Sequence, residues 1–356
     1  MRRSAAVGRF IFVYASIVIY LRSPRQWLRN ARPAGRLAHG ACAARLVARF
    51  VAPAIVLAAS PVHAQWRFAS SPAASAWYDV LDSLRLSGRG ALALTRTPGD
   101  PVAPLARTLA AERFDILQFA PLYYPSATAA ALADALEDAA GTSAPRVPRA
   151  QFLVGAIRTA LPDPRDRLRV AELAGALRRT MPQGADAARL AAWQSAWDRR
   201  FAVALTPFLA RERLDGGVIW IVPALGPEGR LFAGVPADRH DNVIAISEPF
   251  GNDDADGPLF AAVRELCFPL VSRVADRVTD FTKRAGGAAQ AARRASTAAV
   301  RCGAALLDQL APAESDAYRA HWVRVGGGDA FGALYPPDPV LTALILAALS
   351  ALPRSR

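Results

Sequence analysis

Histidine, cysteine and lysine are scarce in this sequence, and their scarcity limits the chemistry that it can carry. The 356 residues include four histidines and three cysteines, and Lys283 is the one lysine among 43 basic residues. No Cys-x-x-Cys or neighbouring Cys/His cluster is present, which argues against a structural zinc site. Gly-x-Ser-x-Gly and a glycine loop after a strand are also missing, so neither a nucleophile-elbow hydrolase nor a phosphate-binding loop is indicated.

Acidic residues are absent from positions 1–64, which hold ten arginines and therefore most of the net charge of +13. The remaining 292 residues carry 33 basic and 30 acidic side chains. A charge of +3 spread over that length gives no basic footprint, so we expect no nucleic-acid partner. The hydrophobic content of 53% and charged content of 21% exclude a mainly disordered chain.

The N-terminal region has the layout of a secretory signal peptide. Residues 45–49 form a basic segment with two arginines, and residues 50–59 are apolar. Val62 and Ala64 place small side chains at −3 and −1 of a cleavage site before Gln65. We therefore expect residues 1–64 to be a leader and the body to be extracytoplasmic, either periplasmic or secreted. A second apolar stretch at 10–21 leaves two alternatives, a mis-assigned start or an uncleaved signal anchor, and membrane contact is expected only through this leader.

The body is predicted to be α+β and predominantly helical. We expect a loose mature N-terminus at 65–75 and a single domain over 76–352. Strand-forming runs lie at 218–222, 231–234 and 242–246, which predicts a small mixed or antiparallel sheet at about 217–247 before a long helix at 257–282. Helices are also predicted at 77–86, 92–111, 126–139 (with Ser126 as its cap), 150–161, 167–181, 185–213 and 285–311. The 340–352 segment, at 13 residues too short to span a membrane, predicts a buried terminal helix.

Cys267 and Cys302 are expected to form a disulfide. They fall on the predicted helices 257–282 and 285–311, which meet at Gly286-Gly287. In an antiparallel hairpin the two positions lie about 6 Å apart along the helix axis, and a disulfide needs Cα atoms within about 7 Å of each other. The alternative is a pair of buried free thiols.

The long helix after the strands carries a degenerate peptidase motif. In zinc peptidases a His-Glu-x-x-His helix follows such a sheet, its two histidines bind the metal, and its glutamate polarises the metal-bound water. Aligned to that pattern, Arg264-Glu265-Leu266-Cys267-Phe268 keeps the glutamate alone. Here the chain resembles a family of secreted bacterial proteins of metallopeptidase type, in outline over 90–282, with a second similar segment at 114–136.

The resemblance implies a zincin-like scaffold whose metal site is lost. Arg264 and Phe268 occupy the two ligand positions, and neither a guanidinium nor a phenyl ring supplies a metal ligand. No metal or other cofactor is therefore expected, and Glu265 is left as a vestigial catalytic residue, for instance in an ion pair with Arg264. The alternative is that Arg264 and Glu265 form the polar face of an ordinary amphipathic helix.

Three functions remain open from the sequence. The first is a non-catalytic protein that binds a peptide or a protein in the former cleft. The second is a structural or envelope-associated helical protein without enzymatic ancestry. The third is a metal-independent hydrolase, in which Glu265, Asp276 or Asp280 pairs with His321 or Glu314 for acid–base chemistry. The acidic loop at 252–257 resembles a calcium loop but lacks the closing glutamate, and His240 lies in an Arg/Asp-rich loop.

Overall fold

The computed structural model describes residues 65–84, 103, 105, 116–181, 184–225, 229–234, 242–248 and 254–353. The predicted leader, the predicted helix at 92–111 and His240 lie wholly or almost wholly outside these residues. Within the described residues the protein is mostly helical and has one small mixed sheet, which confirms the α+β prediction. No helix in this part of the chain is long and apolar enough to cross a membrane.

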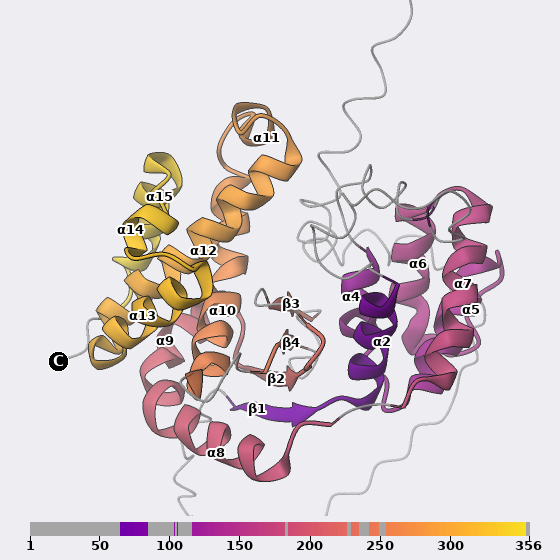
Figure 1. Cartoon of the computed structure of the whole chain (residues 1–356). Coiled ribbons are helices and arrows are strands. Elements are labelled where there is room, and N and C mark those ends of the chain that lie inside the picture. The colour runs from indigo at the N-terminus through magenta and orange to yellow at the C-terminus, as the bar shows by residue number, and fades with distance from the viewer. Residues whose placement is uncertain are drawn as a thin grey trace, which may run out of the picture. The chain divides into compact units, whose positions relative to one another are not determined.

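The sheet has four strands in the order β1-β2-β4-β3 (Figure 1). Strands β2 (Gly216–Ile221), β3 (Arg230–Phe232) and β4 (Val243–Ile246) match the three predicted runs. Strand β4 runs parallel to β2, and β3 is an antiparallel edge strand beside β4. Every side chain of β4 is buried, as expected for a strand that is covered on both faces.

The fourth strand corrects the prediction of a loose segment at 65–75. Gln65–Ser70 forms β1, an edge strand that runs parallel to β2 with Phe68 opposite Ile219. The indole of Trp66 is buried and donates a hydrogen bond to the Leu214 carbonyl oxygen at 3.0 Å. The partner strand lies about 150 positions further along the chain, so local sequence does not reveal the pairing. β1 begins at the residue after the predicted cleavage site.

Helices between β1 and β2 follow the predicted series with two differences: Pro72–Ser83 begins inside the segment predicted to be loose, and Ile116–Tyr123 was not predicted as a helix. The prediction of Ser126 as the cap of α5 is wrong, because the Thr128 side chain accepts from the Ala131 amide and Ser126 donates to the Thr128 carbonyl. The helices are α2 (Pro72–Ser83), α4 (Ile116–Tyr123), α5 (Ala129–Ala140), α6 (Gln151–Ala160), α7 (Pro164–Arg179), α8 (Ala187–Trp197) and α9 (Val203–Glu212), and the π-helical turn Asp198–Ala202 joins the last two.

The second half of the chain is helical after β4. The predicted 257–282 helix is shorter than expected, since α10 (Gly257–Ala275) ends before a turn in which Asp280 adopts a left-handed conformation. Gly286 and Gly287 both have positive φ and form the predicted turn. The remaining helices are α11 (Phe281–Arg284), α12 (Ala288–Leu310), α13 (Ser315–Gly326), α14 (Phe331–Leu334) and α15 (Pro339–Leu349).

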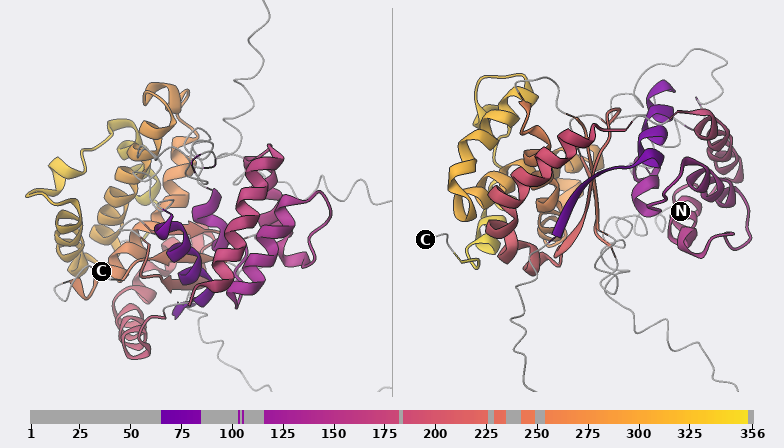
Figure 2. Two further views of the ribbon diagram at one scale, coloured as in Figure 1. Left: turned by 45° about the vertical axis from the view of Figure 1, so that its right-hand side comes forward. Right: turned by 90° about the horizontal axis from the view of Figure 1, so that it is seen from below.

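Helix α10 lies at the centre of the largest hydrophobic core. It contacts β3 and β4 on one side and α12, α13 and α15 on the other, and Figures 1 and 2 show α8–α10 and α12 gathered on one side of the sheet. The segment predicted to be helical at 185–213 belongs to this core, with Trp193, Trp197, Phe201 and Phe208 all buried. The position of α10 explains why its middle is almost inaccessible to water.

Candidate functional site

The degenerate motif lies in the interior of the protein, near the middle of α10. Arg264 and Glu265 are each only 2% exposed. Burial extends around the helix, since all residues from Gly257 to Cys267 are buried. The alternative reading of a solvated polar face on an amphipathic helix is therefore wrong, and two adjacent charges are held where an unpaired charge would cost several kcal/mol (about 3–5).

The two charges satisfy each other. The Arg264 guanidinium donates to the Glu265 carboxylate, which is the ion pair expected for a vestigial glutamate. A second guanidinium nitrogen, Nη2, donates to Ser296 Oγ on α12 at 2.7 Å. The guanidinium carbon lies 4.9 Å from the ring centre of Phe268 and 5.7 Å from that of Trp322, so two aromatic rings flank the cation.

Glu265 is enclosed from the side of the sheet as well. A Cβ atom placed on Gly229, the residue before β3, would lie 2.6 Å from Glu265 Cγ. Only glycine fits at that position without displacing the carboxylate. The backbone before the edge strand thus closes over the glutamate, and no space remains beside Glu265 Cγ for a side chain at this point of the loop.

The donor set at this position does not fit a metal. Arg264 and Phe268 supply no lone pair to a cation, and the Glu265 carboxylate is engaged by the guanidinium. Among the described residues, no group of three histidine, cysteine or acidic side chains is arranged to hold a metal ion. What the arrangement can do is fix α10, α12 and α13 to one another through a neutralised charge pair.

The two cysteines meet as predicted but remain thiols. Cys267 on α10 and Cys302 on α12 are both buried and both free, and their side chains are in hydrogen-bond contact. Burial, with the neighbouring Cys302 thiol, raises the pKa of Cys267 well above its ordinary value. The expected disulfide is thus not present, and the structure shows the alternative, a pair of buried free thiols facing each other across two helices.

His321 has a partner other than those predicted for a hydrolase. Its Nδ1 lies 2.7 Å from Asp254 Oδ1, and Arg324 Nη2 donates to the same oxygen at 2.9 Å. Burial acts to raise the pKa of Asp254, but the contacts with His321 and Arg324 outweigh it and hold that pKa below its ordinary value. The histidine ring also contacts Phe260 and Trp322, so α13 is tied to the start of α10.

The other acidic residues of the hydrolase alternative, Asp276, Asp280 and Glu314, lie at helix ends. Glu314 accepts hydrogen bonds from Arg200, which reaches it from the π-helical turn. Asp276 and Asp280 are exposed beyond the end of α10. Glu265 and Glu314 are thus each engaged by an arginine, and His321 by Asp254.

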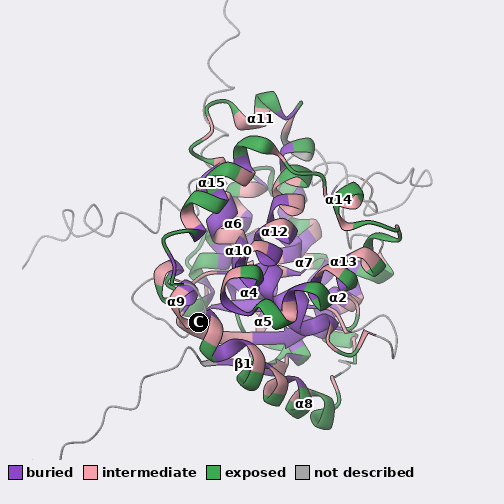
Figure 3. Cartoon of the chain, turned by 90° about the vertical axis from the view of Figure 1, so that its left-hand side faces the viewer, coloured by how far each residue is buried: buried purple, intermediate pink, exposed green. Residues whose placement is uncertain are grey.

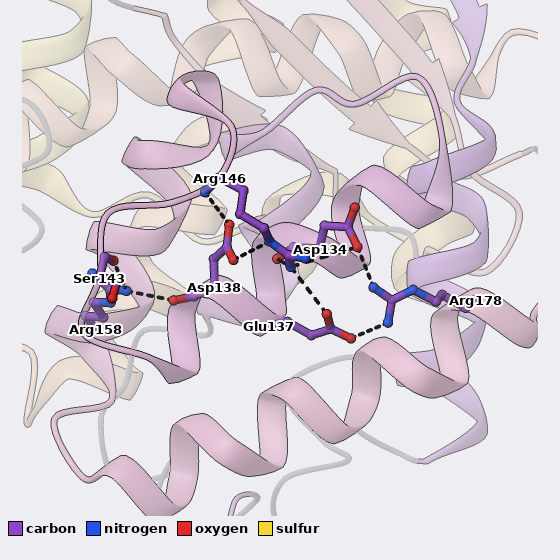
Figure 4. A network of polar contacts seen from close by, with 7 residues as sticks. All are labelled: Asp134, Glu137, Asp138, Ser143, Arg146, Arg158 and Arg178. Carbon is purple, nitrogen blue, oxygen red and sulfur yellow. Dashed lines mark hydrogen bonds and ion pairs between the residues drawn. The ribbon is translucent and has the colours of Figure 1, made fainter.

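A second arginine–carboxylate cluster, on α5–α7, was not anticipated from the sequence. Figure 4 shows Arg178 of α7 bridging Asp134 and Glu137 of α5, and Arg146 bound to Asp138 at 2.7 Å. The hydrogen bond from Arg178 is the main cause that lowers the pKa of Glu137. The acids at i, i+3 and i+4 on α5 are a signal for such a cluster, but their partners come from α7 and from the loop that follows α5.

The Arg158 guanidinium completes this region at the C-terminus of α5. Its Nη2 donates to the carbonyl oxygens of Asp138 and Ser143, both at 2.7 Å (Figure 4). A cation at this end of a helix satisfies carbonyls that have no helical partner and complements the helix dipole. The cluster therefore fastens α5 to its neighbours, and its carboxylates are occupied by guanidinium groups.

Comparison of the chain with protein-family models, with curated proteins and with solved structures finds no match.

Proposed function

We propose that this chain is an exported, non-catalytic protein with a metallopeptidase-like arrangement in which an ion pair has replaced the metal. The observation that carries the proposal is the Arg264–Glu265 pair. It occupies the helix that directly follows the sheet, at the register where zinc peptidases place a ligand and the catalytic glutamate. Both side chains are 2% exposed.

The order of elements supports this reading. Three parallel strands, an antiparallel edge strand and then a long helix correspond to the sheet-then-helix order on which the resemblance rests. Helix α10 packs directly against β3 and β4. The resemblance therefore concerns topology as well as the five-residue motif.

A peptide or protein bound at the former cleft can contact only a small part of the motif at 264–268. Arg264 and Glu265 are inaccessible, whereas Phe268 is half-buried. The proposed binding role is therefore limited at this place to contact with Phe268 and the adjoining surface of α10. Export is supported by the signal-peptide layout of residues 45–64.

Zinc content measured by mass spectrometry tests the proposal. The chain from Gln65 onward is compared with an Arg264→His/Phe268→His variant after both are exposed to zinc and dialysed. We expect the unaltered chain to retain no stoichiometric zinc and the variant to retain it, because two histidines one helical turn apart restore the missing donors beside Glu265.

The matched control is Gln151→His/Gly155→His, which places the same i, i+4 pair at two exposed positions of α6, a helix without an acidic residue. It should retain less zinc than the α10 variant, since a surface pair lacks the neighbouring glutamate. Stoichiometric zinc in the unaltered chain would refute the loss of the metal. If the folded α10 variant retains no more zinc than the control, the register has no metal ancestry, and the structural-protein alternative replaces the peptidase-like one.

A further inference from the structure

The C-terminal helix α15 is apolar on all its faces. The sequence from Pro339 to Pro353 contains no charged residue, and within the helix only Thr342 is polar. A helix at the surface of a water-soluble protein ordinarily carries polar residues on its outer face. An all-apolar helix of this kind was expected to be buried.

The structure shows that only one face of α15 is buried. Leu341, Ile345 and Leu349 point into the core shared with α10 and α12. The opposite face is open, with Val340 at 49%, Leu344 at 37% and Leu346 at 49% exposure. Ala343 and Ala347 lie between them and are also exposed, so the outer face is made of apolar residues. The exposed parts of α15 are green in Figure 3. The prediction of a buried terminal helix is thus half wrong.

Arginines contact both ends of α15. Arg294 pairs with Asp338, the cap of α15, at 3.6 Å, and Arg301 donates to the Tyr335 carbonyl in the segment leading into the helix. Arg211 donates to the Ala348 carbonyl near the other end. In the sequence, Arg354 and Arg356 follow directly. Two acids contact this group, since Asp338 pairs with Arg294 and Glu212 accepts from Arg211 at 3.1 Å.

We propose that the exposed face of α15 docks on an anionic lipid bilayer. Apolar side chains that enter the headgroup boundary, flanked by cations that contact anionic headgroups, are the two features of an interfacial helix. A second copy of the chain is the competing occupant. Packing α15 against α15 of another copy would bring like charges together, which is unfavourable, whereas anionic lipids neutralise the arginines.

The helix lies on the membrane and does not cross it. Its 11 residues extend about 16 Å, whereas a membrane-spanning helix needs about 20 apolar residues. The docking face is separate from the predicted leader, so it would hold the folded body at a membrane surface even after the leader is removed.

A position-specific fluorescence measurement tests the proposal on the full chain. Cys42→Ser removes the third cysteine of the sequence, and the other two, Cys267 and Cys302, are buried. An environment-sensitive dye is then attached at Leu344→Cys and, as the matched control, at Met181→Cys, whose side chain is exposed on a different part of the protein. Vesicles are made of phosphatidylglycerol mixed with phosphatidylcholine, or of phosphatidylcholine alone.

We expect the dye at position 344 to shift to the blue and to be quenched by lipid-borne nitroxide on anionic vesicles. The response should weaken in high salt and on neutral vesicles, since exposed charges are screened. The dye at position 181 should remain in water even if the leader also binds the vesicles. With the dye moved to Leu346→Cys, Val340→Ser/Leu344→Ser should raise the lipid concentration needed for insertion about tenfold.

Two results would overturn the proposal. One is a dye at 344 that stays water-exposed while the chain sediments with anionic vesicles. The other is a blue shift without vesicles together with a doubled mass in light scattering, because the occupant of the face would then be a second copy. The serine substitutions lie on an exposed face, so circular dichroism should show unchanged folding.

Discussion

The same chemical pairing occurs in two opposite environments of this protein. In α10 the Arg264–Glu265 pair is enclosed by helices and by the backbone at Gly229, and both partners are 2% exposed. On α5 and α7, Arg178 and Glu137 form an equivalent pair with side-chain exposures of 35% and 36%. The contacts are alike, but the dielectric around them differs.

The difference shows that contact geometry alone does not tell what an ion pair contributes. A buried pair is attracted strongly but has lost the hydration of both charges, so its net contribution is small while removal of one partner is costly. A surface pair keeps the hydration of both charges, so its net contribution and the cost of removing one partner are both small. Arg273–Glu212 is intermediate, because the glutamate side chain is fully buried and the arginine is 30% exposed.

The largest effect is expected from breaking the buried pair. Glu265→Leu leaves the Arg264 guanidinium without its carboxylate in the core and should lower the free energy of unfolding by about 3–5 kcal/mol. Arg264→Met/Glu265→Leu removes both charges and should cost much less than the single substitution. Urea unfolding of the two variants measures the difference. A double variant as unstable as the single one would contradict the role assigned to burial.

The intermediate pair should give an intermediate loss. Glu212 accepts from Arg273 at 2.6 and 2.8 Å and from Arg211 at 3.1 Å. Glu212→Ala removes these charge-assisted hydrogen bonds, but Arg273 can regain water, so we expect a loss of about 1.5–3 kcal/mol. Urea unfolding of the Glu212→Ala and Glu265→Leu variants under the same conditions ranks their losses of stability. A loss of stability as small as that of a surface pair would show that the partial exposure of Arg273 is enough to cancel the contribution of the Arg273–Glu212 pair.

The smallest effect is expected on α7. Arg178→Ala should lower stability by about 1 kcal/mol or less, and added salt should reduce that loss further. Because the hydrogen bond from Arg178 lowers the pKa of Glu137 below its ordinary 4.5, the stabilisation is present above pH 4.5 and is lost as the pH falls through the folded value. Unfolding curves of both proteins should therefore converge in acid, and a difference that grows in acid would refute this account.

Local sequence was sufficient where the signal was periodic. Apolar residues at helical spacing over 185–213 predicted the helices α8 and α9, and the strand-forming runs predicted β2, β3 and β4. The helical hairpin placed Cys267 beside Cys302, although it did not determine their redox state. Strand β1 was missed because six residues become a strand only through pairing with Gly216–Ile221, a contact that no local pattern encodes.

The motif in α10 could be located from the sequence, but its environment could not. Arg-Glu followed by apolar residues is compatible both with a solvated helix face and with a buried pair. The choice depends on Ser296 and Trp322, which α12 and α13 bring to the guanidinium. Likewise, the acids of α5 were visible as a spacing, but Arg146, Arg158 and Arg178 reach them only in the folded chain.

The sequence by itself determined the helical character, the strands β2, β3 and β4, the absence of metal donors at positions 264 and 268, and the apolar composition of α15. Those properties depend on residue type and short-range periodicity. Tertiary structure decided that Arg264 and Glu265 are buried, that β1 completes the sheet, and that one face of α15 remains open. These depend on which distant segments cover a surface, and coverage is set by the packing of the whole chain.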